Sequence, residues 1–184
     1  NNVTCKELLL RVKVSSTITP SSNPKPIFFL EYCFRLIRET ISNNSNVPEI
    51  DVSSRLMQLL ATWVYTSSAV VDTIFQSATY LSVLANVFKK NYTSIGMENR
   101  LEKFCALFLA VCLATGSGNP NKNEEGNDAI FGFVENVLGV EGLNDMLDDV
   151  VSKCVERTFV TFIEKVRIAA TEKIVKRYTG SGNA

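Results

Sequence analysis

The 184-residue sequence contains no histidine. This absence excludes histidine-dependent catalytic triads, histidine metal ligands and the usual general base near neutral pH. The formal net charge is zero, because 19 Lys and Arg residues balance 19 Asp and Glu residues. This balance argues against a domain that binds nucleic acid electrostatically. With 46% hydrophobic residues the chain has the composition of a folded protein. We therefore expect a folded protein that is not an enzyme and needs no cofactor or metal.

Long apolar runs and paired cysteines are lacking as well. The longest apolar run, residues 104–114, is too short to span a bilayer and is typical of a buried helix. No basic stretch leads into an apolar one near the start, so no signal peptide is predicted. The chain also starts without Met, which indicates a piece of something longer. The five cysteines form no CxxC pair, and the odd count predicts reduced core residues: Cys5, Cys33, Cys105, Cys112 and Cys154.

What the sequence does contain is helical periodicity. Apolar residues recur at spacings of three and four, and no stretch alternates as a strand would. We expect helices over 4–14, 27–41, 51–65, 68–89 with a break near Ser77, 98–115 and 129–138, and one or two more from about 143 to 178. Polar loops separate them at 16–26, 42–48 and 116–127, and residues 180–184 are expected to form a flexible tail.

Two apolar stripes define the expected core. The stripe of the third helix comprises Leu56, Leu59, Leu60, Trp63 and Val64. The stripe of the last segment comprises Met146, Val150, Cys154, Val155, Phe159, Phe162, Val166, Ala169, Ala170 and Ile174. Helices paired through short links predict an α-solenoid, and a compact all-α bundle is the alternative.

Candidate chemistry is sparse. The glycines at Gly116, Gly118, Gly139 and Gly142 follow no strand and precede no GK[ST], so we interpret them as loop and cap residues. The acidic group at Asp145, Asp148 and Asp149 has no converging ligand set, and we interpret it as a solvated helix face.

Charge separates along the chain. Residues 124–149 carry eight acidic residues and no basic one, whereas residues 153–177 carry seven basic and three acidic residues. Such a division predicts either a partner-binding surface or a face laced by salt bridges. The candidate partner-binding residues are Lys165, Arg167, Lys173, Lys176 and Arg177.

Five stretches carry a resemblance to a known family. They are CKELLLRVKVSS at 5–16, NPKPIFFLEYCFRLI at 23–37, SRLMQLLATWVYTSSAVVDTIF at 54–75, YLSVLANVF followed by LEKFCALFLAVCL up to 113, and FGFVENVLGVEGLNDMLDDV at 131–150. In order and spacing the chain resembles the C-terminal part of the globular head of the general vesicular transport factor family, the coiled-coil tethers of ER-to-Golgi traffic. The polar loop at 116–127 and the basic segment after Val150 depart from the family pattern.

The resemblance implies an armadillo-like superhelix over residues 1–179 and a non-catalytic scaffold. It implies Rab GTPases, SNAREs and golgins as partners, a possible homodimer, and peripheral association with the cytosolic face of Golgi membranes in the cytoplasm. It supplies no catalytic residues and no nucleic-acid partner. The rival interpretations are an unrelated helical-repeat adaptor, such as a nuclear-transport scaffold, and a small all-α enzyme.

The ends of a repeat array need polar caps. The first expected helix carries Leu8, Leu9, Leu10, Val12 and Val14, and we expect it to expose an apolar face. The amphipathic segment 155–178 is expected to close the other end.

Overall fold

The computed structural model describes residues 10–14, 27–42, 47–89, 100–116 and 125–180. Within these ranges the chain is all-α apart from one pair of two-residue strands, so the expected fold class is confirmed at this level. The elements are β1 (Lys13–Val14), β2 (Ile27–Phe28), α2 (Phe29–Ser42), α3 (Val47–Val64), α4 (Ser68–Phe75), α5 (Ala78–Lys89), α6 (Arg100–Thr115), α7 (Glu125–Val137), α8 (Gly139–Lys153) and α9 (Arg157–Gly180).

The short strands correct two helix predictions. β1 and β2 pair antiparallel, with Lys13 opposite Phe28, and the amide of Phe29 donates to the carbonyl of Val12 at 2.9 Å. The helix expected over 4–14 is therefore wrong at its end, and the helix expected from 27 begins at Phe29. Pairing between segments distant in sequence satisfies backbone groups that apolar spacing alone does not reveal. Most of the first expected helix lies outside the described residues.

The break expected near Ser77 is confirmed. The amide of Gln76 donates to the carbonyl of Asp72 at the end of α4, and Ser77 accepts from the amide of Leu81 at the start of α5. The Ser77 hydroxyl also accepts from the amide of Tyr80 at 3.4 Å. A serine that receives the first amides of a helix is a favoured N-cap, which explains why α5 begins afresh here.

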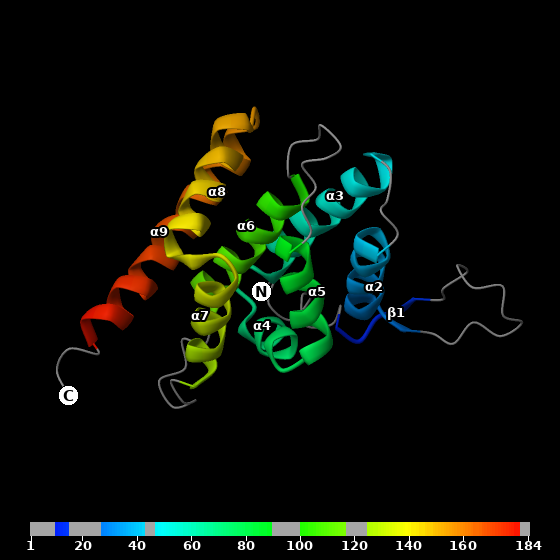
Figure 1. Cartoon of the computed structure of the whole chain (residues 1–184), viewed down its shortest axis with the longest axis horizontal. Coiled ribbons are helices and arrows are strands. Elements are labelled where there is room, and N and C mark those ends of the chain that lie inside the picture. The colour runs from blue at the N-terminus through cyan, green and yellow to red at the C-terminus, as the bar shows by residue number, and fades with distance from the viewer. Residues whose placement is uncertain (1–9, 15–26, 43–46, 90–99, 117–124, 181–184) are drawn as a thin grey trace, which may run out of the picture.

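The apolar run 104–114 is confirmed as an enclosed helix. From Cys105 to Cys112 every residue of α6 is fully buried, and α6 contacts α3, α4, α5, α7, α8 and α9. Figure 1 shows α6 in the middle of the molecule, between α3 on one side and α8 on the other. A helix that is apolar on every side is stable only when neighbours cover all of it, and these helices do so.

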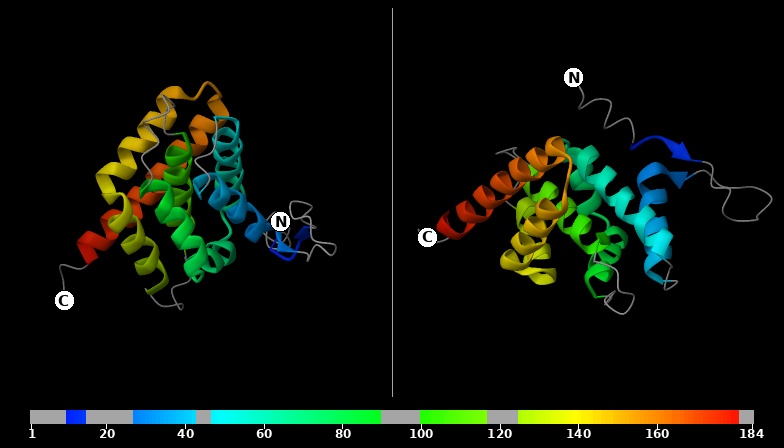
Figure 2. Two further views of the ribbon diagram at one scale, coloured as in Figure 1. Left: turned by 45° about the vertical axis from the view of Figure 1, so that its right-hand side comes forward. Right: turned by 90° about the horizontal axis from the view of Figure 1, so that it is seen from above.

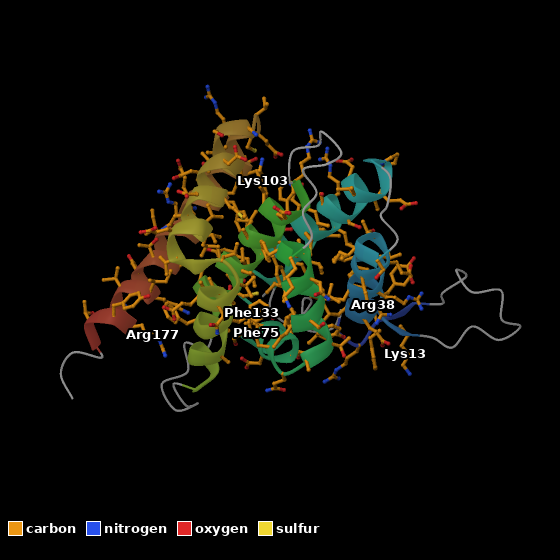
Figure 3. All side chains as sticks on the ribbon, viewed as in Figure 1. Lys13, Arg38, Phe75, Lys103, Phe133 and Arg177 are labelled. Carbon is orange, nitrogen blue, oxygen red and sulfur yellow. The ribbon has the colours of Figure 1, made fainter. Side chains whose placement is uncertain are left out.

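Contacts between helices follow a regular order. α3 packs on α6 and α6 packs on α9, while α2 packs on α5 and α4 packs on α7. Phe34 of α2 stacks on Tyr80 of α5 with ring centres 4.5 Å apart. Phe75 of α4 meets Phe133 of α7 edge to face with ring centres 6.0 Å apart, and Figure 3 labels both residues. Seen from above in Figure 2, the helices run from α2 at one side to α9 at the other. α3 touches α4, the next helix in sequence, but its principal neighbour is α6.

Two residues of the expected stripes lie outside the core. Leu59 is 53% exposed, although Leu60 and Val64 of the same helix are fully buried. Val155 is 97% exposed because it lies in the non-helical link between α8 and α9. That link also shows that the last segment forms two helices.

The C-terminal half begins its helices earlier than expected. Gly139 adopts a left-handed φ of 70°, as expected of a glycine that ends α7. The next helix starts at that same residue, and not near Leu143, because the chain reverses within a single position. At the other end α9 continues through Gly180, and residues 181–184 of the expected tail lie outside the described residues.

The cysteine prediction is confirmed for three residues and corrected for one. Cys33, Cys105 and Cys112 are buried and free, whereas Cys154 is only partly buried in the α8–α9 link. Cys5 lies outside the described residues.

Candidate functional site

The structure places the five candidate partner-binding residues of α9 in different surroundings. Lys165 and Lys176 are exposed on the outer side of the helix. Arg167 instead forms an ion pair with Asp148 of α8. The Nζ of Lys173 donates to the carbonyl of Gly116 at 2.6 Å, and the guanidinium of Arg177 lies 4.9 Å from the centre of the Phe131 ring. Three of the five side chains are thus engaged with other helices.

Lys173 occupies the end of α6. Its partner, the Gly116 carbonyl, follows the last helical residue, where the dipole of a helix favours a cation. Burial lowers the pKa of Lys173, and the neighbouring Lys176 adds to this effect. The side chain therefore acts in packing α9 against α6.

Two members of the acidic group on α8, Asp148 and Asp149, form ion pairs. Asp148 pairs with Arg167, and Asp149 pairs with both Lys103 of α6 and Lys153 of α8. The Asp148–Arg167 bridge joins α8 to α9, as expected for a face laced by salt bridges, while those of Asp149 join α8 to α6 and to its own last turn. The interpretation of Asp148 and Asp149 as merely solvated is corrected accordingly.

A groove opens beside this acidic cluster. Its volume is about 390 Å³, and it lies between the first half of α3, the start of α6 and the end of α8 with the link to α9. In Figure 3 Lys103 marks its position near the upper end of α6, next to α8. The lining residues are Asp51, Arg55, Gln58, Arg100, Lys103, Phe104, Asp149, Val150, Lys153, Cys154, Val155, Glu156 and Phe159.

The inner wall of the groove is apolar. Phe159 and Val150 are largely buried, and Phe104 is half-buried against them. The rings of Phe104 and Phe159 have their centres 6.4 Å apart. The exposed Val155 lies at the edge of the same groove. Together these side chains offer an apolar surface that water covers poorly.

The rim of the groove is ionic. Asp51 lies 3.4 Å from Arg100 and 4.0 Å from Arg55. Asp149 lies 3.2 Å from Lys153 and is bonded to Lys103 as well. The hydrogen bond from Lys103, followed by that from Lys153, holds the pKa of Asp149 below its ordinary value despite some desolvation.

The α8–α9 link closes one edge of the groove. The carbonyl of Glu156 accepts from the amides of Phe159 at 3.1 Å and Val160 at 3.0 Å, so it starts α9. The carboxylate of Glu156 accepts from the hydroxyl of Thr158 at 2.7 Å, while the thiol of Cys154 contacts the Glu156 carbonyl at 3.7 Å. These bonds fix the short link that presents Val155.

Outside the groove, burial raises the pKa of three thiols and one carboxyl group among the described residues. Burial raises the pKa of the Cys33 thiol to about 12 and raises that of Cys105 and Cys112 further above the ordinary range. Burial also raises the pKa of Glu102 on α6 to about 7, although the neighbouring Lys103 opposes this shift. Thiols of this kind are poor nucleophiles near neutral pH.

Among the described residues no three His, Cys, Asp or Glu side chains gather as a metal site would need.

The groove was not foreseen from the sequence. Its walls come from segments around residues 51–58, 100–104 and 149–159, and no spacing along the chain links them. Of its charged residues the sequence singles out only Asp149, as a member of an acidic group, while Val150, Cys154, Val155 and Phe159 were expected in the core. In the described part of the chain no helix combines the length and apolarity that crossing a membrane requires.

Comparison with known proteins adds nothing to the resemblance to the general vesicular transport factor family, whose basis is the five stretches given in the sequence analysis. No protein-family model matches this chain, and a search of curated proteins also finds no match.

Proposed function

We propose that the chain is a segment of an armadillo-like vesicle-tethering head, a non-catalytic protein-interaction scaffold in ER-to-Golgi and intra-Golgi transport. The sequence support is the resemblance of five ordered stretches to the head of the general vesicular transport factor family. The structural support is the order in which the helices pack.

The observation that carries the proposal is that four helices, α2, α3, α4 and α6, each pack on the helix three places further along, whereas α5 has no comparable contact with α8. This relation links α3 to α6, α6 to α9, α2 to α5, and α4 to α7. An armadillo repeat consists of three helices, so stacked repeats bring equivalent helices together at this interval. Under this assignment α4, α5 and α6 form one repeat, and α7, α8 and α9 form the next.

Exposed apolar faces at both ends of the α3–α6–α9 row support a position within a longer array. Val52 and Leu59 lie seven positions apart on α3 and are 62% and 53% exposed. Ile168 and Val175 have the same spacing on α9 and are 61% and 51% exposed. Residues seven apart share one helix face, and in a solenoid such a face is covered by the adjoining repeat.

The proposed partners follow from the family. They are Rab-family GTPases, SNAREs and golgins, with peripheral attachment to the cytosolic face of Golgi membranes. Of the candidate residues on α9, Lys165 and Lys176 are exposed and offer the most accessible cations for such a partner. Arg167, Lys173 and Arg177 contribute to the scaffold through their contacts with α8, α6 and α7.

Affinity capture tests this proposal. The chain, and the longer head that contains it, are presented to GTP-locked and GDP-locked Rab GTPases and to SNARE and golgin fragments. We expect preferential capture of a GTP-locked Rab, weakened when Lys165→Glu and Lys176→Glu are combined. Equal or absent capture by the longer head would contradict the tether assignment and favour the helical-repeat adaptor, which the same helix stacking also permits.

A further inference from the structure

We propose that the groove between α3, α6 and the α8–α9 link binds an acidic peptide segment of a partner protein, with one large apolar side chain seated on Phe104 and Phe159. This inference rests on the proposed role as an interaction scaffold. It does not depend on the tether family, because its evidence is the lining of the groove.

The first argument is the charge of the rim. Asp51 is shared between Arg55 and Arg100, and Asp149 is shared between Lys103 and Lys153. A carboxylate carries one negative charge, so each trio retains one positive charge. The only other ionised side chain in the lining is Glu156, and its carboxylate accepts from Thr158. With Glu156 counted, four cations face three carboxylates, so the lining keeps a net charge of one positive and complements an anionic partner.

The second argument is access. The side chains of Arg55, Arg100 and Lys153 are 71%, 53% and 46% exposed, whereas that of Lys103 is only 15% exposed. Long flexible cations at a solvent-facing rim can turn toward incoming carboxylates without leaving a buried charge unpaired. Lys103 meanwhile keeps Asp149 in place, so the groove retains its shape.

The third argument is the apolar wall. A volume of about 390 Å³ lies at the lower end of the range for sites that hold a small ligand or a few side chains. Val150, Phe104 and Phe159 line its inner side, and Val155 is 97% exposed at its edge. An apolar anchor surrounded by a polar rim is the usual arrangement of a peptide-binding hot spot. A nucleic acid fits less well because the whole chain has no net positive charge.

Fluorescence anisotropy with defined peptides tests the proposal on the complete chain. The probe is a labelled peptide in which one phenylalanine is flanked on both sides by two acidic residues. Its controls have lysine in place of the acidic residues, or alanine in place of the phenylalanine. We expect the acidic apolar peptide to bind, with affinity falling as salt is raised, and each control to bind at least about fivefold more weakly.

Variants locate the binding. Combining Arg55→Glu with Arg100→Glu should weaken binding at least about fivefold, and Val155→Asp should weaken it by a similar factor, since both place negative charge at the groove. Matched controls on α9 are Lys165→Glu with Lys176→Glu, and Val175→Asp, whose side chains are exposed away from the groove. These should bind the peptide as the original chain does. Circular dichroism of every variant confirms that the fold is retained.

Several results would overturn the proposal. They are no binding of the acidic peptide, equal binding of the lysine control, equal binding of a single-stranded oligonucleotide, or loss of binding only in the α9 variants. Its failure is distinguishable from failure of the tether assignment. Capture of a GTP-locked Rab without peptide binding would leave the tether role standing, whereas peptide binding without Rab, SNARE or golgin capture would leave the groove standing.

Discussion

Glu102 is a buried acidic residue at the start of the central helix. Its side chain lies in the first turn of α6, where helix geometry favours a negative charge, yet the residue is only 7% exposed. Desolvation prevails and raises its pKa from 4.5 to about 7. The proton is therefore held to higher pH in the folded chain than in the unfolded chain.

Stability should fall as pH rises through this interval. Between pH 4.5 and about 7 the folded chain binds the extra proton, so the Glu102 contribution decreases across that window and is fully lost above it. We expect Glu102→Gln to raise the free energy of unfolding at pH 8 by about 2 kcal/mol and to leave it nearly unchanged at pH 4.5. Urea titrations at both pH values measure this, with Glu172→Gln as the surface control. An identical difference at the two pH values would contradict the assignment.

Trp63 and Leu59 test the boundary of the core on one helix. Trp63 is 7% exposed and meets the ring of Phe29 edge to face at 5.7 Å. Trp63→Ala should lower the free energy of unfolding by about 3–5 kcal/mol, because it leaves a cavity between α2 and α3. Leu59→Ala, at a side chain that is 53% exposed, should cost about 0.5 kcal/mol. Denaturant unfolding of both variants provides the comparison, and similar losses would mean that the buried face of α3 is wrongly assigned.

At the scale of elements, the sequence predicts helices well and their partners poorly. Spacing of apolar residues locates α2 to α5 because each has one face toward water and one toward the core, whereas α6 is located by its continuous apolar run. It cannot separate Leu59 from Leu60, since both fit a helical stripe that is wide enough to include them. The sequence predicts neither the pairing of Lys13–Val14 with Ile27–Phe28 nor the groove. Both depend on residues that lie far apart in the chain.

The bond between Lys173 and the end of α6 is an element-scale contact open to test. The Nζ–carbonyl distance to Gly116 is 2.6 Å, and it joins α9 to the C-terminus of the enclosed helix. Lys173→Met keeps the length of the side chain but removes the donor and its charge. We expect the free energy of unfolding to fall by about 1 kcal/mol. Lys176→Met, at an exposed site three residues further on, should leave it unchanged within about 0.5 kcal/mol. Equal effects would show that Lys173 acts only through general surface charge.

For the whole molecule, the exposed apolar faces of α3 and α9 decide whether the isolated chain associates with itself. The expectation that the segment 155–178 closes one end is only partly met, because Ile168 and Val175 remain exposed on α9. The expected apolar face of the first helix lies mostly outside the described residues, and α3 carries the exposed Val52 and Leu59. Exposed apolar faces of this kind promote association.

We therefore expect the isolated chain to self-associate, with an average mass that rises with concentration in light scattering. If the α3 face of one copy docks on the α9 face of another, either Leu59→Asp or Ile168→Asp alone should suppress association, since a head-to-tail contact needs both surfaces. If instead α3 pairs with α3 and α9 pairs with α9, each substitution removes only one of the two interfaces. Suppressing association then requires the two substitutions together. Thr171→Asp, at an exposed polar position on α9, controls for added charge. A chain that stays monomeric at every concentration would show that these faces are finished surfaces, and the proposed position within a longer stack of repeats would lose its support.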